Sequence, residues 1–159
     1  MSVHMQIRGG TPVGMMRDLC PISAAAVTYL RLWCGGPDQQ SQVWNALASA
    51  LGTARGRRAL QAFEALFGIC AAHGRRPLIR HAPQCKCVGS DEACFANFIA
   101  TAADGAREDA LLMATLLVRT DMAPVLTSLA TDFGLALKRI DFAARPEMPE
   151  SRPLHTTLH

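Results

Sequence analysis

Residues 90–119 read SDEACFANFIATAADGAREDALLMATLLVR, a pattern that predicts two consecutive helices. In the first half, apolar residues recur three and four positions apart, which is the spacing of one face of a helix. Ser90 is a good N-cap for this helix, and Gly105 follows its end. Residues 107–119 are apolar nearly all round, so we expect the second helix to be the central and most buried one.

The same criteria predict four more helices, and together they indicate an all-α protein. Half of the residues are hydrophobic and only 6% are aromatic, and the abundant Ala and Leu favour helices. We therefore expect a compact bundle of about six helices, with a basic, cysteine-containing loop between the third and the fourth. Prolines, glycines and capping residues separate the four further helices, whose ranges are about 21–34, 38–52, 53–73 and 121–140.

The chain of 159 residues has the length of a single domain. We assign the helical domain to residues 20–142. Residues 1–19 show no helical periodicity and are expected to form a mobile arm, and the proline-containing, polar residues 143–159 are expected to form a disordered tail. The apolar runs are far shorter than the roughly 18 residues of a membrane span, and no signal-peptide pattern is present, so we expect a soluble, cytoplasmic protein.

Metal-capable side chains are concentrated between residues 70 and 94, where the spacing is C-x2-H-x7-H-x3-C-x-C-x6-C. Antiparallel neighbouring helices would bring these residues to one end of the bundle. Zinc takes four nitrogen or sulfur ligands, and nearby basic residues help cysteines to form thiolates. The sequence therefore predicts a metal-binding protein of regulatory or structural type, with zinc as the first choice. The candidate ligands are Cys85, Cys87 and Cys94, with Cys70, His81 or His73 as the fourth.

Three other interpretations use the same cysteines. An iron–sulfur cluster would take four thiolates, although the spacing matches neither common ferredoxin pattern. In a thiol-redox protein, Cys85 and Cys87 would exchange with a disulfide partner, and the small ring that they close would be strained and easily reduced. Alternatively no metal is bound, and Cys34, Cys70 and Cys94 are small core residues.

The loop between the third and fourth helices is also strongly basic. Arg75, Arg76, Arg80 and Lys86 gather there and are candidates for binding an acidic protein or nucleic acid. Residues 55–58 add further arginines at the start of the third helix, where a helix-turn-helix arrangement would place a recognition helix. The protein would then be a helical interaction or nucleic-acid-binding module in which the cysteines are incidental.

Motifs of the common enzyme classes are missing from the sequence. It contains no phosphate-binding loop, no dinucleotide-binding glycine pattern, no nucleophile elbow and no helical zinc-protease motif. The sequence therefore favours a non-catalytic role and leaves an enzymatic one open.

Overall fold

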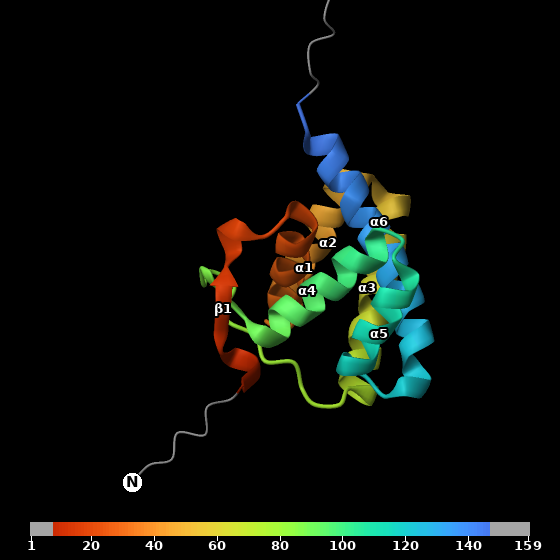
Figure 1. Ribbon diagram of the computed structural model, residues 1–159. Coiled ribbons are helices and arrows are strands. Elements are labelled where there is room, and N and C mark those ends of the chain that lie inside the picture. The colour runs from red at the N-terminus through yellow and green to blue at the C-terminus, as the bar shows by residue number, and fades with distance from the viewer. Residues whose placement is uncertain (1–7, 147–159) are drawn as a thin grey trace, which may run out of the picture.

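The computed structural model describes residues 8–146 and confirms a compact helical fold, with one small sheet in this range. Six α-helices account for most of the described chain, and each lies within a few residues of a predicted one (Figure 1). The helices are α1 (Pro21–Trp33), α2 (Pro37–Leu51), α3 (Thr53–His73), α4 (Ser90–Ala103), α5 (Arg107–Leu117) and α6 (Ala123–Ala144). Residues 74–89, between α3 and α4, are called the cysteine loop below.

The centre of the bundle lies where α4 meets α6. Helix α4 packs against α1, α5 and α6, and α6 also packs against α3. Phe63, Phe95, Phe98 and Phe133 are fully buried in this region. A Cβ at Gly134 of α6 would lie only 2.7 Å from the Cβ of an alanine on α4. The absence of a side chain at this position therefore lets the two central helices approach closely.

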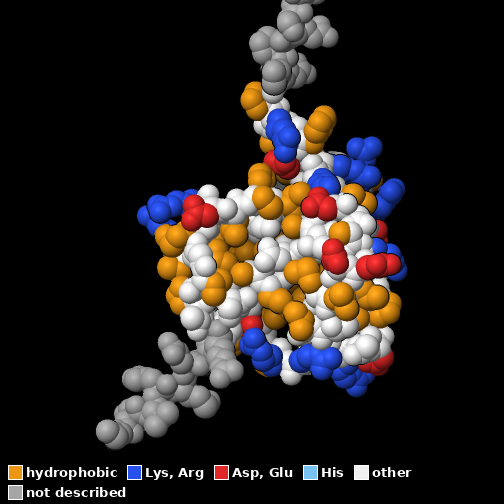
Figure 2. Space-filling model, viewed as in Figure 1, with side chains coloured by type: hydrophobic (Ala, Val, Ile, Leu, Met, Phe, Trp, Pro, Cys, Tyr) orange, Lys and Arg blue, Asp and Glu red, His pale blue; other side chains and the backbone are white. Residues whose placement is uncertain are grey.

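The prediction that residues 107–119 are central is wrong, because α5 lies at the surface. Leu112 and Leu116 are each 67% exposed, whereas the small Ala110 and Ala114 are fully buried. Helix α5 thus packs against α4 and α6 through alanines and presents leucines to solvent, and apolar side chains cover this part of the surface in Figure 2. A helix that is apolar on every side does not reveal from its sequence which face lies inward.

The segment before α1 pairs with the cysteine loop. Strand β1 (Pro12–Met15) runs antiparallel to β2 (Cys87–Gly89). A backbone hydrogen bond of 2.8 Å from Met16 to the carbonyl of Lys86 continues the pairing. In Figure 1 the N-terminal strand lies across the side of the bundle where the cysteine loop runs. The loop is therefore bounded on one side by a strand from the beginning of the chain.

The predicted arm and tail are only partly covered by the structure. Residues 8–19 have no helical periodicity, and they form β1 with short 3-10 turns on either side. A strand partner more than 70 positions away in the chain leaves no local pattern to predict. The remaining parts of the arm and tail, residues 1–7 and most of 143–159, lie outside the described residues.

The longest helices are α3, with 21 residues, and α6, with 22. Both carry charged side chains along their length. Within residues 8–146, no helix combines the length and the apolar character that crossing a membrane requires.

The two sides of α5 should differ in their sensitivity to truncation. Leu117→Ala removes a side chain that is only 6% exposed, and it should lower the free energy of unfolding by about 2–4 kcal/mol. Leu112→Ala is the matched control and should change it by less than about 1 kcal/mol, because that side chain is already in solvent. Urea denaturation followed by circular dichroism measures both, and equal losses would contradict the surface position of α5.

Candidate functional site

A buried ion pair joins α1 to the first turn of α4. The Arg31 guanidinium donates to both carboxylate oxygens of Glu92, with N···O distances of 2.7 and 2.9 Å. The two side chains are only 1% and 0% exposed. Removing two charges from water costs more than their attraction returns unless their other polar atoms also find partners. In this protein the partners come from the backbone of the cysteine loop.

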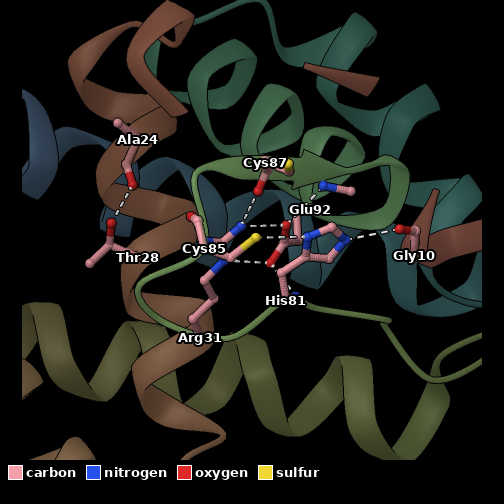
Figure 3. Close-up of polar contacts among 9 residues, drawn as sticks. Gly10, Ala24, Thr28, Arg31, His81, Cys85, Cys87 and Glu92 are labelled. Carbon is pink, nitrogen blue, oxygen red and sulfur yellow. Dashed lines mark hydrogen bonds and ion pairs between the residues drawn. The ribbon is translucent and has the colours of Figure 1, made fainter. Parts of the chain in front are cut away.

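The ion pair holds the cysteine loop at four points, most of which are visible in Figure 3. The guanidinium donates to the carbonyls of Cys85 and Cys87, at 2.7 and 2.6 Å. The carboxylate accepts from the backbone N–H groups of His81 and Gly89, each at 2.9 Å. The backbone positions of both cysteines and of the histidine are therefore fixed relative to the core.

A second carboxylate anchors the first part of the cysteine loop. Asp91, whose side chain is 5% exposed, forms an ion pair with Arg76. The guanidinium donates to both carboxylate oxygens, and Oδ2 also accepts the backbone N–H of Ile79 at 2.7 Å. Asp91 and Glu92 lie in the first turn of α4, where negative charge complements the helix dipole. Through the hydrogen bonds described above, both carboxylates also hold the preceding loop.

Arg31 is the important residue that sequence reasoning missed. It follows Val27 by four positions, and both are buried on the inward side of α1. A charged residue at an apolar position of a helix needs a buried partner of opposite charge. Its place in the pattern of α1 was therefore a usable signal for an ion pair.

His81 contacts the thiol of Cys85 through one ring nitrogen and a backbone carbonyl through the other (Figure 3). Its Nδ1 lies 3.4 Å from Cys85 Sγ, and its Nε2 lies 2.9 Å from the carbonyl oxygen of Gly10. A carbonyl can only accept a hydrogen bond, so Nε2 carries a proton and Nδ1 faces the sulfur. A proton can therefore pass between the thiol and Nδ1.

The electrostatics of this contact lower the pKa of the thiol and raise the pKa of the imidazole. The hydrogen bond from His81 lowers the pKa of Cys85, and a further hydrogen bond from the backbone of Cys87 acts in the same direction. The hydrogen bond to Gly10 and the contact with Cys85 raise the pKa of His81, and burial opposes this only in part. Each partner of the contact thus stabilises the charged form of the other.

The pKa values of three other cysteines shift in the opposite direction, upward. Burial raises the pKa of Cys34 and Cys94, and it raises the pKa of Cys70 to about 12. These thiols stay protonated at neutral pH, and a protonated thiol is a poor nucleophile. Of these four thiols, Cys85 is therefore the one whose surroundings favour ionisation.

Comparison with known proteins adds no relative to this description. No protein-family model, no curated protein and no solved structure matches the chain. The chemistry of the site has to be inferred from its own contacts and charges.

The predicted metal ligands do not form one site in this structure. In the described part of the chain, no three Cys, His, Asp or Glu side chains are placed to hold a metal ion. Cys70 belongs to the hydrophobic core and Cys94 packs against it, whereas His81 and Cys85 contact each other. His73 ends α3. The residues therefore do not fit a tetrahedral zinc site or a four-thiolate cluster, and metal binding stays a prediction without support from the geometry.

Three of the four basic residues predicted to bind a partner make contacts inside the fold. Arg75 donates from Nε to a backbone carbonyl of α5 at 2.5 Å, and Arg76 pairs with Asp91. Arg80 makes a longer contact of 3.5 Å with the carbonyl at the end of α1, and Lys86 is exposed. Arg80 and Lys86 therefore present more of their charge to solvent, and binding of an acidic protein or nucleic acid stays a prediction.

Removing one charge of the buried pair should destabilise the fold strongly. Glu92→Gln leaves the Arg31 guanidinium buried without a counter-charge, and it should lower the free energy of unfolding by about 3–5 kcal/mol. The double variant Arg31→Met, Glu92→Leu removes both charges and should lose less than the single variant. Chemical denaturation of the three proteins compares them, and a loss below about 1 kcal/mol for Glu92→Gln would refute the role given to the pair.

The same pair should make stability depend on pH in the acid range. Burial opposes ionisation of Glu92, but hydrogen bonds from Arg31 and from two backbone N–H groups outweigh it, so its pKa in the folded state lies below the ordinary 4.5. Such a group stabilises the fold above its unfolded pKa, and the contribution is lost as the pH falls through the folded pKa. Denaturation at a series of pH values should show stability declining below about 4.5. The decline should be shallower in the double variant, and identical slopes would contradict this account.

Proposed function

We propose that this chain is a thiol–disulfide exchange protein, with Cys85 as its reactive thiol and Cys87 as the second thiol of the pair. The observation that carries the proposal is the 3.4 Å contact between His81 Nδ1 and Cys85 Sγ. An imidazole within hydrogen-bond distance of a thiol is a common means of producing a thiolate at neutral pH, and the thiolate is the nucleophile in exchange reactions.

The surroundings of Cys85 suit a reacting sulfur. The residue lies on a loop, is partly exposed, and is followed by the exposed Lys86. Its carbonyl is held by Arg31, so the backbone that carries the sulfur is fixed even though the side chain is accessible. The imidazole is fixed in turn by its hydrogen bond to Gly10. Nucleophile, base and the group that orients the base are thus all present.

The exchange takes place in two displacements. The Cys85 thiolate attacks one sulfur of a substrate disulfide, the substrate S–S bond breaks, and the departing sulfur takes the proton of the His81 imidazolium. Cys87 then gives its proton to His81 and attacks the Cys85 sulfur of the mixed disulfide. The second substrate sulfur leaves and takes that proton. Two electrons pass from the Cys85–Cys87 dithiol to the substrate, which becomes two thiols, and the reverse sequence oxidises a substrate dithiol.

Two properties of the pair favour its reduced form. The imidazolium of His81 stabilises the Cys85 thiolate, which exists only after reduction. The ring that a Cys85–Cys87 disulfide closes is small and strained, and strain makes a disulfide easier to reduce. The disulfide form should therefore act as an oxidant of substrate dithiols.

Cys85 should react with iodoacetamide at a lower pH than an ordinary cysteine does. Because His81 lowers the pKa of this thiol from its ordinary 9.0, the thiolate forms earlier as the pH rises. His81→Gln should move the midpoint of the alkylation profile back toward that ordinary value, whereas Cys94→Ser, the control, should leave it unchanged. Mass spectrometry of the peptide that contains Cys85 gives the rates, and an unchanged profile in His81→Gln would overturn the activation of Cys85.

Equilibration with glutathione tests the thiol pair itself. The oxidised protein should contain a disulfide between Cys85 and Cys87, and in His81→Gln this disulfide should form under more reducing conditions because the thiolate has lost its partner. Metal analysis and an absorption spectrum of anaerobically purified protein complete the test. Stoichiometric zinc, or the colour of an iron–sulfur cluster, that is lost in Cys85→Ser would replace exchange with metal binding.

A further inference from the structure

A groove beside the cysteine loop has the dimensions of a small-molecule site. It lies between the C-terminal parts of α1 and α3 and the residues that follow α3, and its volume is about 410 Å³. Pockets that bind small ligands typically measure roughly 300–1,000 Å³. The floor of the groove is apolar and includes Leu30, Phe67, Cys70 and Leu78. An apolar ligand body placed there would release water from this surface.

The charged side chains along the groove are all basic. Arg75, Arg76 and Arg80 line it, and no acidic residue of the described chain does so. Arg76 is neutralised by Asp91, and Arg75 already uses its Nε on a backbone carbonyl. Within residues 8–146, the hydrogen bond of the Arg80 side chain is the 3.5 Å contact with the carbonyl of Cys34, so most of its N–H donors remain available to an anion. Figure 2 shows basic side chains gathered at the end of the molecule where the first part of the cysteine loop runs.

A second hollow continues the groove toward the thiol site. It shares Cys34 and Arg80 with the first, and His81 is also part of its lining. Arg80 therefore borders both the groove with the apolar floor and the hollow that the imidazole in contact with Cys85 also lines. Among the described residues, the lining of this second hollow is also free of acidic side chains.

We infer that the groove binds a small organic acid, with its apolar body on the floor formed by α1 and α3 and its carboxylate at Arg80. A guanidinium matches a carboxylate with two parallel hydrogen bonds. The surplus of positive charge disfavours a cation, and the apolar floor disfavours a fully polar anion such as phosphate. The inference goes beyond disulfide exchange, because binding requires neither the thiol of Cys85 nor the imidazole of His81.

Calorimetric titration of the 159-residue chain with octanoate tests the inference. Octanoate should bind saturably at one site, and octanol, which has the same chain without the charge, should bind at least about tenfold more weakly. Arg80→Gln should weaken octanoate binding by about tenfold. The matched control is Arg57→Gln. It changes an exposed arginine of α3 that does not line the groove, and it should leave the affinity unchanged.

A second variant tests the position of the ligand without touching a charge. Ala71 is exposed and lines the groove, so the ring of Ala71→Phe would occupy the ligand space without disturbing the core. This variant should keep its circular dichroism spectrum and melting temperature and lose octanoate binding. The absence of saturable binding to the wild type, equal affinities for octanoate and octanol, or unchanged affinity in both variants would overturn the inference. None of these outcomes affects the alkylation profile of Cys85.

Discussion

Two opposite charges, Arg31 and Glu92, are sealed inside this protein, and the geometry of the cysteine loop follows from the need to satisfy them. Neither side chain can be hydrated, so their remaining donors and acceptors must find partners within the chain. The loop has irregular backbone, and its N–H and C=O groups need partners as well. The ion pair and the loop backbone therefore satisfy each other's donors and acceptors. A pair of charges that is costly to bury thus anchors a segment without regular structure.

The anchor extends from the core to His81 and the two loop cysteines through short steps. Helices α1 and α4 pack against each other in the centre of the bundle and hold the two charges. The charges hold the backbone of His81, Cys85 and Cys87. The side chains of His81 and Cys85 meet on this fixed backbone, and the carbonyl of Gly10 holds the ring. The backbone of this exposed loop is in this way held as firmly as that of a helix. The proposed proton transfer between His81 and Cys85 requires such fixed positions.

The sequence predicts the helices well because helix boundaries are set locally. The range 53–73 matches α3 to the residue, since Gly52 and Gly74 flank it on both sides. Which face of α5 lies inward was not predictable, because residues 111–118 are apolar nearly all round. In the site, the cluster that contains His81 and Cys85 stands out in the sequence. Its geometry does not, because the contacts that create it come from residues 54 and 71 positions away.

Among the described residues, the structure does not bring the predicted metal ligands together, for a related reason. Closeness in sequence says nothing about the side of a helix on which a residue lies. Cys70 is part of the apolar face of α3 that builds the core, and Cys94 packs at the edge of the same core. For Cys70 and Cys94 the sequence also allowed the interpretation that they are small core residues, and their packing in the structure agrees with it.

The contact between Gly10 and His81 also has a consequence for the order of events in folding. Gly10 and β1 are synthesised before residues 81–89, so β1 can pair with β2 only after the cysteine loop has also been made. Local helices form faster than contacts between distant segments, so this pairing comes late in folding. Until then the ring of His81 lacks the hydrogen bond to Gly10 that orients it beside Cys85. In the proposed exchange reaction, Cys85 would therefore gain its oriented base only in the folded protein.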